Sequence, residues 1–275
     1  MRNSNSMLFQ KLVTLVSFLA VVEVLVAAPE IVPIQEKAQG QSLVGSNLLN
    51  DSLYSNPAGS SFTNAYAVEG TMVMPKSFLA SVIDTKSSAI GGGLGYFRNF
   101  DNNATDPLQG VKLSVFGKVS EFIGVGVAGK ALWGSDSVGK VSHKDADLGL
   151  LGQYEFATFG LVVRNVLGGE ARLGQEQELG LGARIGYEEI LFFSAAVQAK
   201  WEGFSPYQYG MGFEFISPYY FGIKGGYRIQ PDADLSFWSA GLSLTAPKIS
   251  VTYAVEFPSS DNLSAEHLLS TTLLF

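Results

Sequence analysis

The 275-residue chain contains no cysteine and only two histidines, His143 and His267. The absence of cysteine excludes disulfide frameworks, thiolate zinc sites, iron–sulfur clusters, thiol catalysis and a lipoprotein anchor attached through cysteine. Two histidines are too few for a histidine-rich metal centre, so we expect neither a metal site nor a cofactor.

Charged residues are also scarce, at 16% of the chain against 47% hydrophobic and 12% aromatic residues. This composition excludes an intrinsically disordered protein, in which apolar and aromatic residues are few. The 18 basic and 25 acidic residues give a net charge of −7, which argues against a nucleic-acid partner because phosphates are neutralised by basic surfaces. The length fits one sizeable domain or two small ones.

Long hydrophobic runs are missing after the first 28 residues. Within them, Arg2 and Lys11 precede an apolar run from Leu12 to Ala28, which ends on the small residues Val26-Ala27-Ala28. This pattern predicts a cleaved secretory signal peptide over residues 1–28. The alternative is a membrane anchor, but a span needs about 20 clean apolar residues and Glu23 interrupts the run.

What the rest of the chain does have is apolar residues at every second position, which is the period of β-strands. In one segment Val125, Val127 and Trp133 alternate with Gly124, Gly126 and other small or polar residues. We predict an all-β fold of about 14 strands in segments of about ten residues. The segments are Asn64–Val73, Phe78–Thr85, Ala89–Phe97, Val111–Val119, Phe122–Trp133, Asp147–Glu155, Phe159–Val166, Gln177–Tyr187, Leu191–Trp201, Tyr207–Ile216, Tyr220–Ile229, Leu235–Leu244, Ile249–Phe257 and His267–Phe275.

The predicted connections alternate between tight turns, such as Ser120-Glu121, and longer polar loops, such as Arg98–Gly110, Gly134–Ala146 and Leu167–Glu176. Short turns at one rim and long loops at the other are typical of a transmembrane antiparallel β-barrel in a bacterial outer membrane. We therefore expect the tight turns in the periplasm, the long loops outside the cell, and a protein located in the outer membrane.

Twelve charged residues of the predicted strands fall on the face opposite the apolar one. A charge on the lipid face at mid-bilayer costs roughly 2–4 kcal/mol, so membrane insertion requires this segregation. A soluble β-sandwich also alternates, but it would not normally turn aromatic rings outward near the tight turns. These lumen charges could attract anionic solutes or form paired ladders that fill a narrow interior. They are Lys112, Lys118, Lys130, Asp147, Arg164, Glu178, Arg184, Lys200, Glu214, Lys224, Arg228 and Glu256.

The segment between the predicted signal peptide and the first strand is too polar for a membrane strand. It includes Asn56-Pro57-Ala58, followed by Gly59. This motif resembles the N-terminal hatch of the FadL-like superfamily, outer-membrane transporters of long-chain fatty acids and other hydrophobic compounds, which also includes PorV-like barrels that serve secretion machinery. The resemblance implies a short plug over residues 29–63 inside a barrel over residues 64–275. The motif could line the transport path or form a rigid surface turn.

Two further features fit this interpretation. Gly91, Gly93 and Gly95 share one face of the third predicted strand, where they could allow close packing against the plug, a wall bulge that opens sideways, or curvature alone. The chain ends on an alternating strand with Phe275 as its last residue, which resembles the C-terminal insertion signal of outer-membrane barrels. We therefore expect the barrel-insertion machinery and outer-membrane lipids as partners.

The sequence does not predict an enzyme, because neither histidine has a convincing catalytic partner. We expect a passive transporter of small hydrophobic or amphipathic, fatty-acid-like compounds, with such molecules as ligands. The alternative is a barrel that transports nothing and acts as a secretion or assembly scaffold or as a structural protein. The predicted loops are shorter than the extracellular insertions typical of fatty-acid transporters of this class.

Overall fold

The computed structural model describes residues 32–46, 48–74, 77–100, 107–136, 139–170, 175–260 and 263–275. The predicted signal peptide lies outside these residues, as do parts of four predicted loops and a few positions of the predicted plug.

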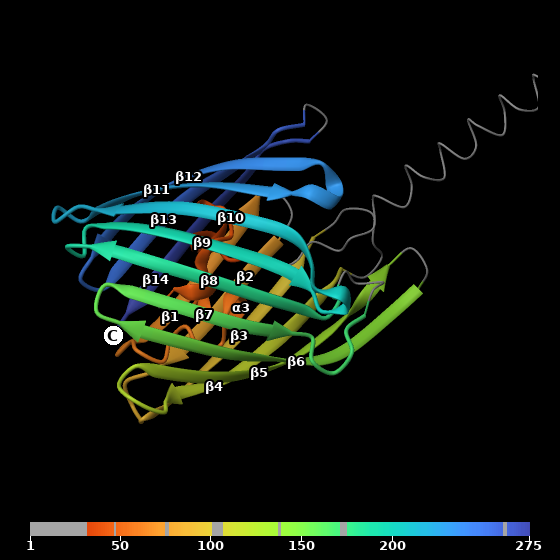
Figure 1. The fold of residues 1–275 in the computed structure, drawn as a ribbon, viewed down its shortest axis with the longest axis horizontal. Coiled ribbons are helices and arrows are strands. Elements are labelled where there is room, and N and C mark those ends of the chain that lie inside the picture. The colour runs from red at the N-terminus through yellow and green to blue at the C-terminus, as the bar shows by residue number, and fades with distance from the viewer. Residues whose placement is uncertain are drawn as a thin grey trace, which may run out of the picture.

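The described chain forms a closed barrel of fourteen antiparallel strands (Figure 1). This confirms the predicted all-β barrel with a short N-terminal plug. The strands are β1 (Tyr66–Met74), β2 (Ser77–Asp84), β3 (Ile90–Asn99), β4 (Gln109–Lys118), β5 (Ile123–Asp136), β6 (Gly139–Tyr154), β7 (Ala157–Arg164), β8 (Glu178–Tyr187), β9 (Leu191–Lys200), β10 (Ser205–Ile216), β11 (Phe221–Gln230), β12 (Leu235–Ala246), β13 (Ile249–Pro258) and β14 (Glu266–Leu274).

Each strand pairs with its neighbours along the chain, and β14 closes the barrel by pairing with β1 from Ala67↔Leu274 to Met74↔His267. Phe275 completes the closure: its backbone N–H donates to the carbonyl of Tyr66 at 2.9 Å, and the two rings pack edge to face. The wall therefore satisfies its own backbone hydrogen bonds, as a membrane-spanning barrel must.

The two rims of the barrel differ in their connections. The tight-turn rim carries the connections 85–89, 119–122, 155–156, 188–190, 217–220 and 247–248, together with both ends of the wall. The long-loop rim carries the other seven connections, and 165–177 between β7 and β8 is the longest of these. We use these two names for the rims below.

The prediction of a loop over Gly134–Ala146 is wrong for most of its length. β5 continues to Asp136 and β6 already begins at Gly139, so two long strands form a hairpin here. The strand period persists, with Val141 and Asp145 buried on one face and Lys140 and Lys144 exposed on the other. The outward residues of this part of β6 are mostly polar. A prediction based on alternating apolar residues alone therefore does not recognise it as a strand.

The N-terminal segment lies inside the barrel and forms the plug (Figure 1). Its three short helices are α2 (Ile34–Ala38), η1 (Leu43–Gly45) and α3 (Ser52–Ser55). They contact opposite parts of the wall: α2 packs against β11 to β14, η1 against β7 to β9, and α3 against β3 and β4. None of the described helices is long and apolar enough to span a membrane.

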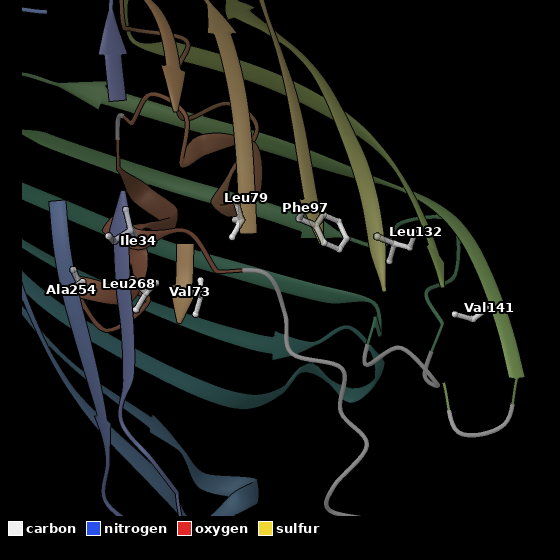
Figure 2. Close-up of a cluster of buried hydrophobic side chains, with 9 residues drawn as sticks. Ile34, Val73, Leu79, Phe97, Leu132, Val141, Ala254 and Leu268 are labelled. Atoms are coloured by element: carbon white, nitrogen blue, oxygen red, sulfur yellow. The ribbon is translucent and has the colours of Figure 1, made fainter. Parts of the chain in front are cut away.

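The main cluster of buried apolar side chains also lies inside the barrel, in the half toward the long-loop rim (Figure 2). Val73, Leu79, Phe97, Leu132 and Val141 point inward from five strands, and Ile34 of the plug joins them. The inner face of β1, β2, β3, β5 and β6 therefore carries an apolar cluster toward this rim, whereas charged side chains such as Arg164, Arg228 and Glu256 face the lumen toward the same rim from β7, β11 and β13.

The outward face should reject charge. Val125→Arg and Leu181→Arg place a cation where the native side chains are 39% and 44% exposed on the apolar outer face. Each substitution should destabilise the folded protein in a bilayer by about 2–4 kcal/mol. Denaturant titration in lipid vesicles measures this loss. Gln153→Arg is the matched control, because Gln153 lines an internal cavity of about 480 Å³. Equal losses in all three variants would contradict the register.

Candidate functional site

The plug is seated on glycines of the wall. A Cβ atom at Gly126 would overlap the backbone of Pro57, one at Gly149 would overlap Asn56, and one at Gly160 would overlap the backbone of Val44. Because glycine carries no side chain, plug and wall approach at backbone distance. The wall glycines whose missing side chain is replaced by the plug are Gly93, Gly95, Gly124, Gly126, Gly149, Gly160, Gly180, Gly182, Gly210, Gly212, Gly226 and Gly241. We call this set the glycine ring.

Asn56 joins the plug to the wall by hydrogen bonds. Its side-chain amide donates to the carbonyl of Val44 at 2.9 Å and to the wall carbonyls of Leu150 and Leu161 at 3.1 and 3.4 Å. Its Oδ1 accepts the backbone N–H of Ala58 at 3.0 Å. Asn56 and Ala58 are both fully buried, so the motif Asn56-Pro57-Ala58-Gly59 is not a surface turn. It holds the plug against β6 and β7.

The three glycines of β3 also pack against interior groups. Gly93 faces Leu53 and Gly95 faces Tyr54, both in α3, while Gly91 faces the ring of Phe116. β3 pairs with β4 in continuous register through all three positions, and with β2 through Gly93 and Gly95. The structure therefore has close packing here and no bulge in the wall, because the inward space is taken up by α3 and by an aromatic ring.

Most of the predicted lumen charges form buried ion pairs. Asp147 binds Lys112 at 2.5 Å and Lys130 at 3.1 Å, and Glu214 binds Arg184 at 2.6 Å and Lys224 at 2.9 Å. Each cluster joins three strands of the wall. Loss of one member of a buried pair is costly because it leaves the partner charge without compensation.

Other pairs connect the wall to the plug. Arg164 pairs with Glu178 at 3.4 Å and donates to the carbonyl of Ser55 in α3 at 3.0 Å. Arg228 pairs with Glu256 at 3.1 Å. In α2, Lys37 contacts Glu256 at 3.6 Å and also pairs with Glu266 of β14. The role of Lys37 could not be predicted from the sequence, because nothing in the local pattern of the plug shows which wall residue it contacts.

The two remaining predicted charges lie near the rims. Lys200 pairs with Glu176 at 2.9 Å, where both side chains are 45% exposed. Lys118 lies over the ring of Phe62, with its Nζ 5.3 Å from the ring centre, at the tight-turn rim.

Two carboxyl groups that were not predicted meet where the plug touches β1. Asp51, which is 3% exposed, accepts the backbone N–H of Gln35 at 2.8 Å. Glu69 of β1 accepts hydrogen bonds from Thr71 at 3.1 Å and Thr272 at 2.9 Å. Burial raises the pKa of the Asp51 carboxyl well above its usual range, and the nearby negative charge of Glu69 raises it further.

Two cavities lie on the tight-turn side of the plug. One, of about 470 Å³, is lined by Asp51, Glu69, Lys224 and Phe221, among others, and reaches Pro218 in the turn between β10 and β11. The other, of about 480 Å³, lies between Gln153, Thr158, Phe192 and Arg184. Arg184 borders both cavities. Both volumes fall within the usual range of roughly 300–1,000 Å³ for small-molecule sites.

The described residues include no group of three or more histidine, aspartate or glutamate side chains arranged to hold a metal ion. The predicted loop residue His143 contacts Asp145 at 3.1 Å, and His267 accepts or donates a hydrogen bond with Tyr253 at 2.6 Å. Asp145 also accepts the backbone N–H groups of Leu167 and Gly169, so it orders the start of the loop between β7 and β8.

No protein-family model matches the sequence, and no curated protein matches it. Solved structures do share its fold. The CymD monoaromatic hydrocarbon channel is 12% identical with a TM-score of 0.63, over 87% of this chain and 96% of that one. The Ralstonia pickettii toluene transporter TbuX is 11% identical with a TM-score of 0.62, over 91% and 98% of the two chains.

A Pseudomonas aeruginosa FadL homologue is 13% identical with a TM-score of 0.57, over 90% of this chain and 99% of that one. The chain therefore has the FadL-like barrel fold that the Asn56-Pro57-Ala58 motif predicts. At these identities the likeness concerns the fold.

The glycine ring should be essential for seating the plug. Gly126→Ala places a methyl group against the backbone of Pro57, whereas Gly129 on the same strand has no heavy atom within 4 Å of the position of an added Cβ. Gly126→Ala should destabilise the protein by about 1–3 kcal/mol and expose the plug to protease, while Gly129→Ala should change neither property. Thermal unfolding and limited proteolysis in detergent measure both. A harmless Gly126→Ala would contradict the glycine ring.

Asp51 should make the protein more stable in acid. Because its pKa is raised in the folded state, the folded protein holds a proton that the unfolded chain has released above about pH 4. That contribution is present at low pH and is lost as the pH rises through the raised pKa. Asp51→Asn should flatten the decline of the melting temperature that begins at about pH 4 and continues as the pH rises through the raised pKa. Glu189→Gln, on an exposed turn, should leave the decline unchanged.

Proposed function

We propose that this chain, which has the FadL-like fold, is a passive outer-membrane conduit for small hydrophobic or amphipathic compounds, fatty-acid-like molecules included. The observation that carries the proposal is an apolar cluster on the inner face of β1, β2, β3, β5 and β6 toward the long-loop rim, together with two cavities beyond the plug. These cavities, of about 470 and 480 Å³, lie on the tight-turn side.

The apolar cluster favours apolar solutes. Its inward side chains include Val73, Leu79, Phe97, Leu132 and Val141, so water gains few hydrogen bonds beside it while a hydrocarbon loses nothing (Figure 2). The names of the structural neighbours, a hydrocarbon channel and a toluene transporter, agree with this class of cargo.

The cavity beside Lys224 favours amphipathic solutes as well. It combines apolar side chains such as Phe221 and Ile216 with the charged groups of Arg184, Glu214 and Lys224. A molecule with an apolar body and a polar end could place each part against matching groups. This lining supports the inclusion of fatty-acid-like compounds in the proposal.

Passage of a solute from the apolar cluster to the cavities on the tight-turn side requires the plug to move. At the glycine ring the plug and the wall are in backbone contact, and Asn56 bonds to carbonyls of two wall strands. We therefore infer that transport is gated by displacement of part of the plug.

The tight seating of the plug also favours a second candidate function. A barrel whose lumen stays closed would serve as a scaffold for other proteins or as a structural element of the membrane. The ion pairs between Lys37 and the carboxylates of Glu256 and Glu266 hold the plug as such a closed interior would require.

A disulfide between plug and wall separates the two functions. Ser42 of the plug and Ser194 of β9 have hydroxyl oxygens 2.6 Å apart, and the chain has no other cysteine to interfere. In liposomes, oxidised Ser42→Cys/Ser194→Cys should pass an apolar solute such as toluene at least about tenfold more slowly than the reduced form, because the tether fixes the plug. Addition of a reductant should restore the flux.

The control is a disulfide within the plug. Ser52 and Ser60 also have hydroxyl oxygens 2.6 Å apart, so Ser52→Cys/Ser60→Cys stiffens the plug without tethering it to the wall. This variant should keep its flux on oxidation. A solute flux that is the same in the oxidised and reduced forms of both variants would refute gating by the plug. No flux in the wild-type protein, for either apolar or amphipathic solutes, would refute the conduit and leave the scaffold.

A further inference from the structure

Three cations stand apart from the lumen charges because they lie on the outside of the barrel. Arg98 is on β3, and Lys140 and Lys144 are on β6, and all three side chains are exposed. They lie toward the long-loop rim. In the other described strands, the outward positions of that half carry apolar, aromatic, hydroxyl, amide or histidine side chains, as in Met72, Gln109 and His267.

The strand register places these cations on one surface. Arg98 is opposite Gln109, Gln109 is opposite Trp133, and Trp133 is opposite Ser142. Lys140 and Lys144 flank Ser142 on the same face of β6, because each is two residues away. With adjacent strands about 4.8 Å apart, the surface from β3 to β6 is about 14 Å wide, which is the scale of a lipid headgroup. We call Arg98, Lys140, Lys144 and Trp133 the outer basic patch.

The charges of this patch are uncompensated within the described part of the chain. Lys112, Lys130, Arg164, Arg184, Lys200, Lys224 and Arg228 in the wall, and Lys37 in the plug, all have a carboxylate partner. No described carboxylate forms an ion pair with Arg98, Lys140 or Lys144. The guanidinium of Arg98 instead lies 5.5 Å from the ring centre of Phe100, which is itself exposed.

The height of the patch on the barrel indicates what covers it. On β5 the outward residues from Ile123 to Ala131 are apolar or glycine, and Trp133 follows them. Ten residues of a strand tilted by about 45° rise about 24 Å, close to the apolar band of about 25 Å in membrane barrels. Trp133 therefore lies where aromatic residues mark the membrane interface. In the register of β5 and β6, Lys140 lies one outward-facing residue pair beyond Trp133, and Lys144 lies one such pair inside it, opposite Ala131. The long lysine side chain can extend from there to the interface.

We propose that the outer basic patch binds the phosphorylated headgroup of a lipid in the outer leaflet. This inference rests on the outer-membrane placement in the proposed function, though not on transport. Cations without protein partners complement phosphate charge, since arginine binds phosphate through paired N–H donors and lysine through its ammonium group. The apolar surface of β4 and β5 below them, including Val111, Val125 and Val127, accommodates the acyl chains.

The test uses the full chain in a neutral detergent and lipid A as the probe. Native mass spectrometry measures its binding with both phosphates present and with both removed. The wild type should prefer the phosphorylated form, and Arg98→Ala/Lys140→Ala/Lys144→Ala should weaken its binding on the order of 100-fold, since each cation near an anionic surface contributes several-fold. Binding of the dephosphorylated form should not change.

The matched control is Lys86→Ala/Lys248→Ala, which removes two exposed lysines at the tight-turn rim. It should bind phosphorylated lipid A as the wild type does. Triple-variant binding equal to wild type, or an equal loss in the control, would overturn the proposal. Competition by inorganic phosphate at the affinity of the lipid would also overturn it, because the patch would then be a free-phosphate site. Solute flux through the triple variant should stay at the wild-type level, which separates this test from that of the conduit.

Discussion

A barrel wall that spans a membrane uses its backbone hydrogen bonds on itself, so anything inside it must be held by other means. In this chain that means is the glycine ring. Glycines such as Gly126, Gly149 and Gly160 leave room for the backbone of the plug to lie directly on the wall. Asn56 then bonds to wall carbonyls on their lumen side. The order of the plug, the closure of the lumen and the position of both cavities depend on this contact.

The charges of the interior follow from the same arrangement. Asp147, Glu214 and Glu256 are buried inside the wall, and each has at least one cationic partner. The pairs join neighbouring strands and, through Lys37 and Arg164, join the wall to the plug. Asp51 and Glu69 are the place where two carboxyl groups meet across this junction. The raised pKa of Asp51 is the consequence, because burial and a like charge both disfavour its ionised form.

Much of the fold could be predicted for two reasons. The period of a strand is two residues, and a charged side chain on the lipid-facing side of a membrane strand is energetically costly. The number of strands, the outward face and the closure by the last strand all follow from that rule. The rule failed where outward residues are polar, as at Lys140 and Lys144, so the hairpin of β5 and β6 was taken for a loop. The sequence pattern places the wall glycines on the inner face. It does not predict that they contact the plug, because the partner of each is far away in the sequence, as Pro57 is from Gly126.

The charges on the two faces of the wall are thus compensated in different ways. Inside, charges are confined, so they pair with one another and fix the plug. Outside, at the edge of the apolar band, Arg98, Lys140 and Lys144 meet no described carboxylate. Since a cation at an interface gains most from an anion in the medium beside it, the composition of that medium decides how strongly this side of the barrel is held. These cations lie on β3 and β6, and α3 packs against β3 and β4 from within. The part of the wall that meets the lipid headgroups is therefore also a part that supports the plug.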